Sequence, residues 1–124
     1  MIGATTWVFA DGYIPSASTG PEPQLTSHES ACILNAGDVD AHVEIQLYFT
    51  DRPPAGPYRL TVPARRAFHQ RINDLRDPEP VPLGVDYCCV LTSDAPIVVQ
   101  HTRLDSRQAA NALMSTIAYT PTNG

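Results

Sequence analysis

A strict alternation of apolar and more polar side chains runs through Ala41-His42-Val43-Glu44-Ile45-Gln46-Leu47-Tyr48-Phe49-Thr50. Successive side chains of a β-strand point to opposite faces of the sheet, so a period of two indicates a strand with one buried face. The side chains expected to be buried are Val43, Ile45, Leu47 and Phe49. A one-residue slip would bury Glu44 and Gln46 instead, so this pattern also fixes the expected register.

Other strand-like segments lie on both sides of residues 41–50. They are residues 5–9, 31–34, 58–62, 67–72, 85–93, 96–104 and 113–119. Turn-forming residues separate several of them, namely Asn35-Ala36-Gly37-Asp38, the Pro-rich stretch 51–57, and Asp94-Ala95. We expect long loops at residues 11–26 and 73–82, with one helical turn at 74–76, and a wide turn at 105–112.

Short strands at this spacing, punctuated by Pro and Gly, are typical of an antiparallel β-sandwich. We therefore predict an all-β fold of about eight short strands that forms a single domain over residues 1–124. A chain of this length can bury enough surface for one hydrophobic core. Besides the residues named above, the core is expected to contain Leu60, Val62, Ile97 and Val99.

The charge of the chain argues against one class of partner. There are 13 acidic and 8 basic side chains, which gives a formal net charge of -5, and every basic residue is Arg. Proteins that bind DNA or RNA carry a basic patch that neutralises phosphates. Nucleic acid is therefore not an expected partner.

The sequence also predicts where the protein resides. No apolar run approaches the roughly 18 residues that suggest a transmembrane helix, and Met1-Ile2-Gly3-Ala4 does not resemble the start of a signal peptide. The three cysteines, Cys32, Cys88 and Cys89, are odd in number and include no Cys-x-x-Cys pair. We expect reduced thiols in a cytoplasmic protein.

Motifs for catalysis and metal binding are missing from the sequence. His28-Glu29 lacks the second histidine, four positions from the first, that a zinc-protease helix requires. There is no Gly-rich phosphate loop and no nucleophile elbow. We expect no catalytic residue, no cofactor and no metal.

One polar run is unusual because it directly follows an apolar strand. It consists of Gln100-His101-Thr102-Arg103-Leu104-Asp105-Ser106-Arg107-Gln108. Alternation places His101 and Arg103 on the same face as Val99. A guanidinium there needs partners with planar geometry, and we expect Asp105 to hold Arg103. The run fits a ligand site and an internal or intersubunit ion-pair network equally well.

Several collinear blocks resemble the sensory rhodopsin transducer family. They are Trp7, Gly12-Tyr13-Ile14-Pro15, Gly20-Pro21-Glu22-Pro23-Gln24, Ser27-His28-Glu29, Cys32 to Asp38, Asp40 to Ile45, Gly56 to Arg66, Asn73-Asp74-Leu75, Pro96 to Arg107, and Ser115-Thr116-Ile117-Ala118-Tyr119. The resemblance covers nearly the whole chain. The sequence departs from the family pattern at residues 51–55 and 83–91 and in having no Lys.

This resemblance implies a soluble bacterial β-sandwich that assembles as a homotetramer. It further implies a non-enzymatic signal transducer whose partner is a membrane-embedded sensory rhodopsin or another receptor, bound at its cytoplasmic face. Relatives in bacteria without a rhodopsin leave an alternative open, namely a sensor module for a small polar, sugar-like ligand. The two functions do not exclude each other.

If such a ligand binds, we expect its site where polar residues gather at one end of the sandwich. Arg103 is the expected anchor, because it offers a planar fork of donors, and Trp7 is expected to supply an apolar platform. The expected ligand-binding residues are Trp7, His28, Glu29, Asn35, Asn73, Gln100, His101, Arg103, Asp105 and Arg107.

Overall fold

The computed structural model describes residues 1–110 and 112–121. These residues form seven strands and one short helix. In chain order the elements are β1 (Ala4–Tyr13), β2 (His28–Asn35), β3 (Ala41–Phe49), β4 (Ala55–Val62), β5 (Arg66–Arg71), the 3-10 helix η1 (Ile72–Asp74), β6 (Asp86–Asp105) and β7 (Ala112–Ile117). Within this part of the chain no helix is long and apolar enough to span a membrane.

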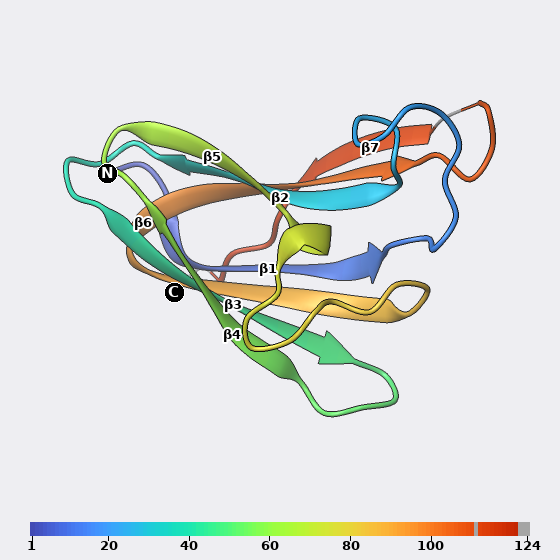
Figure 1. Cartoon of the computed structure of the whole chain (residues 1–124). Helices are drawn as coiled ribbons and strands as arrows, with labels where there is room; N and C mark the ends of the chain where they lie inside the picture. Colours follow the sequence, from blue (N-terminus) through green and yellow to red (C-terminus); the bar gives the residue numbers. More distant parts are fainter. Residues whose placement is uncertain (111, 122–124) are drawn as a thin grey trace.

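All strand pairs are antiparallel, and β6 belongs to both layers of the fold (Figure 1). The first half of β6 pairs with β1 and β3, and β4 completes that layer, here called the β3 sheet. The second half of β6 pairs with β2 and β7, and β5 completes the other layer, called the β2 sheet. The prediction of an all-β antiparallel sandwich is confirmed.

Strand β6 corrects one detail of that prediction. Residues 86–105 form a single strand of 20 residues, whereas the sequence suggested two strands joined by a turn at Asp94-Ala95. The chain stays extended there, with Ala95 buried and Ser93 Oγ bonded to the Ala95 carbonyl at 2.6 Å. The described residues therefore hold seven strands instead of about eight.

The boundaries of several other elements also differ from the sequence prediction. Strand β1 continues to Tyr13 instead of ending at residue 9, because Gly12 and Tyr13 still pair with β6. Strand β2 begins at His28 instead of Ala31. The helical turn lies at residues 72–74 instead of 74–76, and β7 covers residues 112–117 instead of 113–119.

The alternation in β3 has the predicted register. Val43, Ile45 and Leu47 are buried between the layers, while Glu44 is exposed. The predicted core residues Val62, Ile97 and Val99 are buried as well. Phe49 and Leu60 are half-buried, contrary to prediction, since one ends β3 and the other lies on the edge strand β4.

Candidate functional site

A carboxylate lies at the centre of the most polar part of the interior. Glu29, on β2, has no exposed surface, and its two oxygens accept four hydrogen bonds. Oε1 accepts from the Tyr87 hydroxyl at 2.7 Å and from His101 Nε2 at 2.8 Å. Oε2 accepts from the Tyr13 backbone N–H and from Arg103 Nε, both at 2.8 Å. We call these five residues the Glu29 cluster.

The shared strand β6 explains how this cluster assembles. Tyr87 lies in the half of β6 that belongs to the β3 sheet, while His101 and Arg103 lie in the half that belongs to the β2 sheet. Glu29 is directly opposite Arg103 in the β2–β6 register. The carboxylate therefore bonds to donors from both layers of the sandwich.

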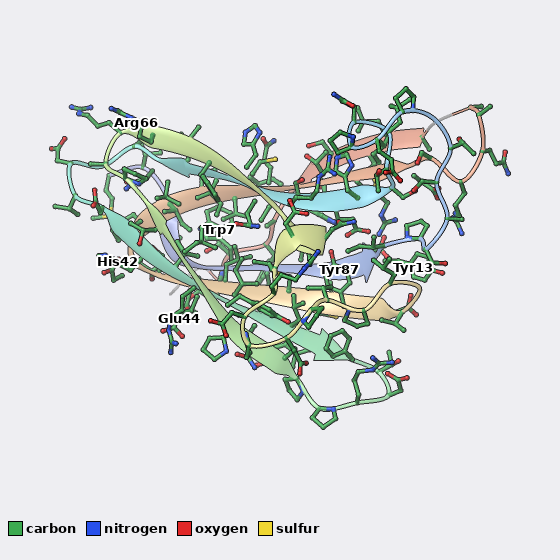
Figure 2. The ribbon with its side chains drawn as sticks, viewed as in Figure 1. Trp7, Tyr13, His42, Glu44, Arg66 and Tyr87 are labelled. Atoms are coloured by element: carbon green, nitrogen blue, oxygen red, sulfur yellow. The ribbon has the colours of Figure 1, made fainter. Side chains whose placement is uncertain are left out.

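Close packing holds the donors of the cluster in place. The His101 ring stacks on Phe9 at a centroid distance of 4.0 Å, and Phe9 meets Tyr87 edge to face at 6.2 Å. Gly12 lies against the Tyr87 ring so closely that a side chain there would collide with it, since a Cβ would be 2.4 Å from Cζ. Figure 2 shows Tyr13 and Tyr87 at the same end of the molecule.

The environment of Glu29 favours its charged form. Burial alone would raise the pKa of Glu29, but hydrogen bonds from His101, Tyr87 and Tyr13 and the charge of Arg103 outweigh burial and lower it. Burial and the neighbouring carboxylate raise the pKa of Tyr87 well above its ordinary value, so its hydroxyl remains a donor. Burial would lower the pKa of Arg103, but the charge of Glu29, its hydrogen bond to Arg103 and the charge of Asp11 together outweigh burial and raise the pKa.

Four of the predicted ligand-binding residues lie together. Glu29, His101 and Arg103 are in direct contact, and Asn73 joins them because its Oδ1 accepts from the Glu29 backbone N–H at 3.3 Å. The Asn73 amide also donates to the Ser27 carbonyl at 3.0 Å. Arg103 reaches the surface, where its side chain is 22% exposed and its Nη2 donates to the Asp11 carbonyl.

The predicted pairing of Arg103 with Asp105 is wrong. Asp105 bonds instead to Arg107, at 2.6 Å between Oδ2 and Nη2, and Arg107 also lies over the Tyr13 ring. Residues 103 and 105 share a face, but the buried Glu29 on the adjacent strand is the nearer and better desolvated acceptor. Asp105 is the last residue of β6 and is half-buried, and the exposed Arg107 lies in the turn that follows.

Two predicted residues are buried in other parts of the sandwich. Asn35 ends β2 at the opposite end from Glu29, where its buried amide donates to the carbonyls of Val39, Val62 and Pro63. Trp7 is a core residue, not an exposed platform, and its indole N–H donates to the Ala4 and Ile97 carbonyls.

The remaining two predicted residues lie on or near the β2 sheet surface. The ring of the half-buried His28 bonds through Nδ1 to the Thr26 carbonyl at 2.7 Å. Gln100 is exposed on the outer face of the β2 sheet, opposite in direction to His101. Neither side chain contacts Glu29.

Sequence reasoning missed Tyr13 and Tyr87 as members of the cluster. Tyr87 alternates with Cys89 and Leu91, which marks it as inward-facing, and a buried tyrosine needs a hydrogen-bond partner. Tyr13 contributes only its backbone N–H, and side-chain patterns carry no signal for such a donor.

Two of the hollows on the surface of the described residues are lined by charged or amide side chains. One, of about 580 Å³, lies on the outer face of the β3 sheet between the pairs His42–Asp94 and Glu44–Arg59. The other, of about 470 Å³, is lined by Arg71, Asn73 and Arg76 beside η1. Within residues 1–110 and 112–121, no three His, Cys, Asp or Glu side chains gather in an arrangement that could hold a metal ion.

Comparison with known proteins gives a consistent result. The sequence profile of the family described as "Anabaena sensory rhodopsin transducer" matches residues 2–120. A solved structure named "Anabaena sensory rhodopsin transducer" is 65% identical, with 87% of this chain and 94% of that chain covered and a TM-score of 0.76. The crystal structure of Thermotoga maritima 1070 is 36% identical over 96% of each chain, with a TM-score of 0.86. No curated protein matches.

The Glu29 cluster predicts a specific response to acid. Because the pKa of Glu29 is lowered on folding, the cluster stabilises the fold above the ordinary pKa of 4.5, and this stabilisation is lost as pH falls below it. We expect Glu29→Gln to lower the free energy of unfolding at pH 7 by about 3 kcal/mol, because it leaves Arg103 without its counter-charge. Urea denaturation at pH 7 and pH 3 measures both effects.

The free energies of unfolding of wild type and Glu29→Gln should move closer together as pH falls below 4.5, because protonation of Glu29 then favours the unfolded wild-type chain. Glu44→Gln is the matched control, because Glu44 is exposed and its pair with Arg59 is long, at 3.8 Å. It should leave stability within about 0.5 kcal/mol of wild type at either pH. A Glu29→Gln deficit of the same size at pH 3 and pH 7 would contradict this account of the cluster.

Proposed function

We propose that this chain, which belongs to the Anabaena sensory rhodopsin transducer family, is a non-enzymatic signal transducer. In this proposal it is a soluble cytoplasmic homotetramer that docks on the cytoplasmic face of a membrane-embedded sensory rhodopsin. The observation that carries the proposal is 65% identity to the solved Anabaena transducer over 94% of that chain.

Charge supports docking on a membrane receptor. Cytoplasmic loops of membrane proteins carry an excess of Lys and Arg, and four chains of charge -5 would together carry 4 × (-5) = -20. Opposite charges steer association and make it sensitive to salt. The protein should therefore approach such a receptor by electrostatic attraction.

Binding to a sensory rhodopsin in nanodiscs tests the proposal. We expect the protein to bind nanodiscs that contain the Anabaena-type sensory rhodopsin, and to bind more weakly as salt is raised, because screening removes the long-range attraction. Nanodiscs of the same lipids with a proton-pumping rhodopsin are the control. Equal binding to both nanodiscs, or binding to neither, would contradict the proposal.

A second candidate function is sensing of a small polar, sugar-like ligand. The hollow of about 470 Å³ favours it, since Arg71, Asn73 and Arg76 offer donors and acceptors beside the apolar side chains of Val81 and Leu83. This hollow adjoins the Glu29 cluster through Asn73.

A thermal-shift screen of sugars and sugar acids tests the second candidate. A ligand of this hollow should raise the unfolding temperature of the wild type but not of Arg76→Ala. His42→Ala, in the hollow of the β3 sheet, is the matched control and should retain the shift. A screen in which no compound stabilises the wild type, or in which Arg76→Ala keeps the full shift, would reject this site.

A further inference from the structure

Two arginine side chains line one hollow without a carboxylate partner. Most arginines of the chain pair with Asp or Glu, namely Arg52, Arg59, Arg65, Arg103 and Arg107. Among the residues that the structure describes, Arg66, Arg71 and Arg76 pair with no carboxylate. Arg71 and Arg76 both line the hollow of about 470 Å³ beside η1, here called the η1 hollow. Two guanidiniums that lack a counter-charge at one place are the groups that an anion needs for recognition.

Backbone carbonyls hold both guanidiniums by the same nitrogen. Arg71 Nη1 donates to the Pro23 carbonyl at 3.2 Å. Arg76 Nη1 donates to the carbonyls of Asn73 and Leu75. Within residues 1–110 and 112–121, no acceptor bonds to Nε or Nη2 of either side chain. Nε and Nη2 form an edge that can bind a carboxylate through two parallel hydrogen bonds, so each guanidinium is anchored and still has its binding edge available.

Hydrogen bonds also fix the walls of the η1 hollow relative to each other. Arg71 is the last residue of β5, and its bond to Pro23 joins β5 to the loop before β2. Asn73 in η1 donates to the Ser27 carbonyl and accepts from the Glu29 backbone N–H, which joins η1 to the start of β2. A site that is held in place before its ligand arrives loses less conformational entropy when the ligand binds.

The other side chains of the η1 hollow restrict the kind of anion. Glu22 and Asp74 also line it, so the two acidic groups offset the charge of the two arginines. A phosphate group, with a charge of about -1.5 to -2, is therefore less favoured than a single carboxylate. The carboxylates of Glu22 and Asp74 can accept hydrogen bonds from hydroxyl groups, and Val81 and Leu83 add apolar surface.

We propose that the η1 hollow binds a hydroxylated carboxylic acid of the sugar-acid class. The carboxylate of this ligand bonds to the Nε–Nη2 edges of Arg71 and Arg76, and its hydroxyl groups donate to Glu22 and Asp74. The proposal rests on the second candidate function above and narrows its ligand from sugar-like molecules in general to their acids. A neutral sugar would leave both guanidiniums without a counter-charge.

NMR of the Arg Nε–H groups during titration of the wild type tests the carboxylate contact directly. The probes are D-galacturonate, D-galactose and acetate, at constant ionic strength. We expect galacturonate to shift the Nε–H signals of Arg71 and Arg76, acetate to shift them at higher concentration, and galactose to leave them in place. Arg66 is the matched control, because it also lacks a carboxylate partner among the described residues and its Nη1 also donates to a backbone carbonyl, at 3.1 Å.

Other results would overturn the proposal in distinguishable ways. Equal shifts at Arg66, Arg71 and Arg76 would show attraction of charge alone, without a site. Galactose shifts as large as those from galacturonate would remove the carboxylate contact and leave the second candidate function standing. Acetate as effective as galacturonate would remove the hydroxyl contacts. If neither carboxylate moved the two signals, the proposal would fall, whereas the thermal-shift screen would still decide the second candidate function.

Arginine-to-lysine variants assign the signals and provide a second measurement. Arg71→Lys and Arg76→Lys keep the positive charge but lose the planar fork, and each removes one Nε–H signal. We expect each to weaken galacturonate binding about tenfold, because a charge-assisted contact with two hydrogen bonds is lost. Arg66→Lys should bind like the wild type. Undiminished binding by Arg71→Lys and Arg76→Lys would overturn the proposal, and the wild-type titration decides it if a variant fails to fold.

Discussion

The buried carboxylate of Glu29 is the constraint on which the rest of the structure depends. An ionised group without solvent contact is tolerated only when its lone pairs are satisfied and its charge is balanced. Here four donors satisfy it, and Arg103 balances the charge. Tyr87 on the β3-sheet half of β6 and His101 on the β2-sheet half must both reach one carboxylate, which fixes how the layers meet at this end.

The long strand β6 makes that meeting possible. Because one strand belongs to both sheets, the donors on its two halves keep a defined position relative to Glu29 on β2. The opposite end has a smaller polar anchor, since Asn35 ties the end of β2 to the turn before β3 and to the end of β4. Between these ends the core is apolar, with Trp7 in its interior.

The sequence predicted the parts of this structure that depend on local alternation. The period of two in β3 gave the correct register, and the same rule placed His101 and Arg103 on the inner face. The predictions were wrong where contacts with segments distant in sequence determine the side-chain pairing or the extent of a strand. Asp105 is close to Arg103 in sequence, yet Arg103 bonds to Glu29 on another strand. Asp94-Ala95 has the composition of a turn, but the chain remains extended there because both sheets pair with β6. Family membership, by contrast, was recoverable because collinear blocks extend along almost the whole chain.

The most direct test of the central claim is a double-mutant cycle between Glu29→Ala and Tyr87→Phe, read as free energies of unfolding from urea denaturation. These residues join the two layers through one hydrogen bond of 2.7 Å. Because the bond is buried and its acceptor is charged, we predict a coupling energy of about 1.5–3 kcal/mol. Effects that add to within about 0.5 kcal/mol would contradict the claim that this carboxylate ties the two sheets together.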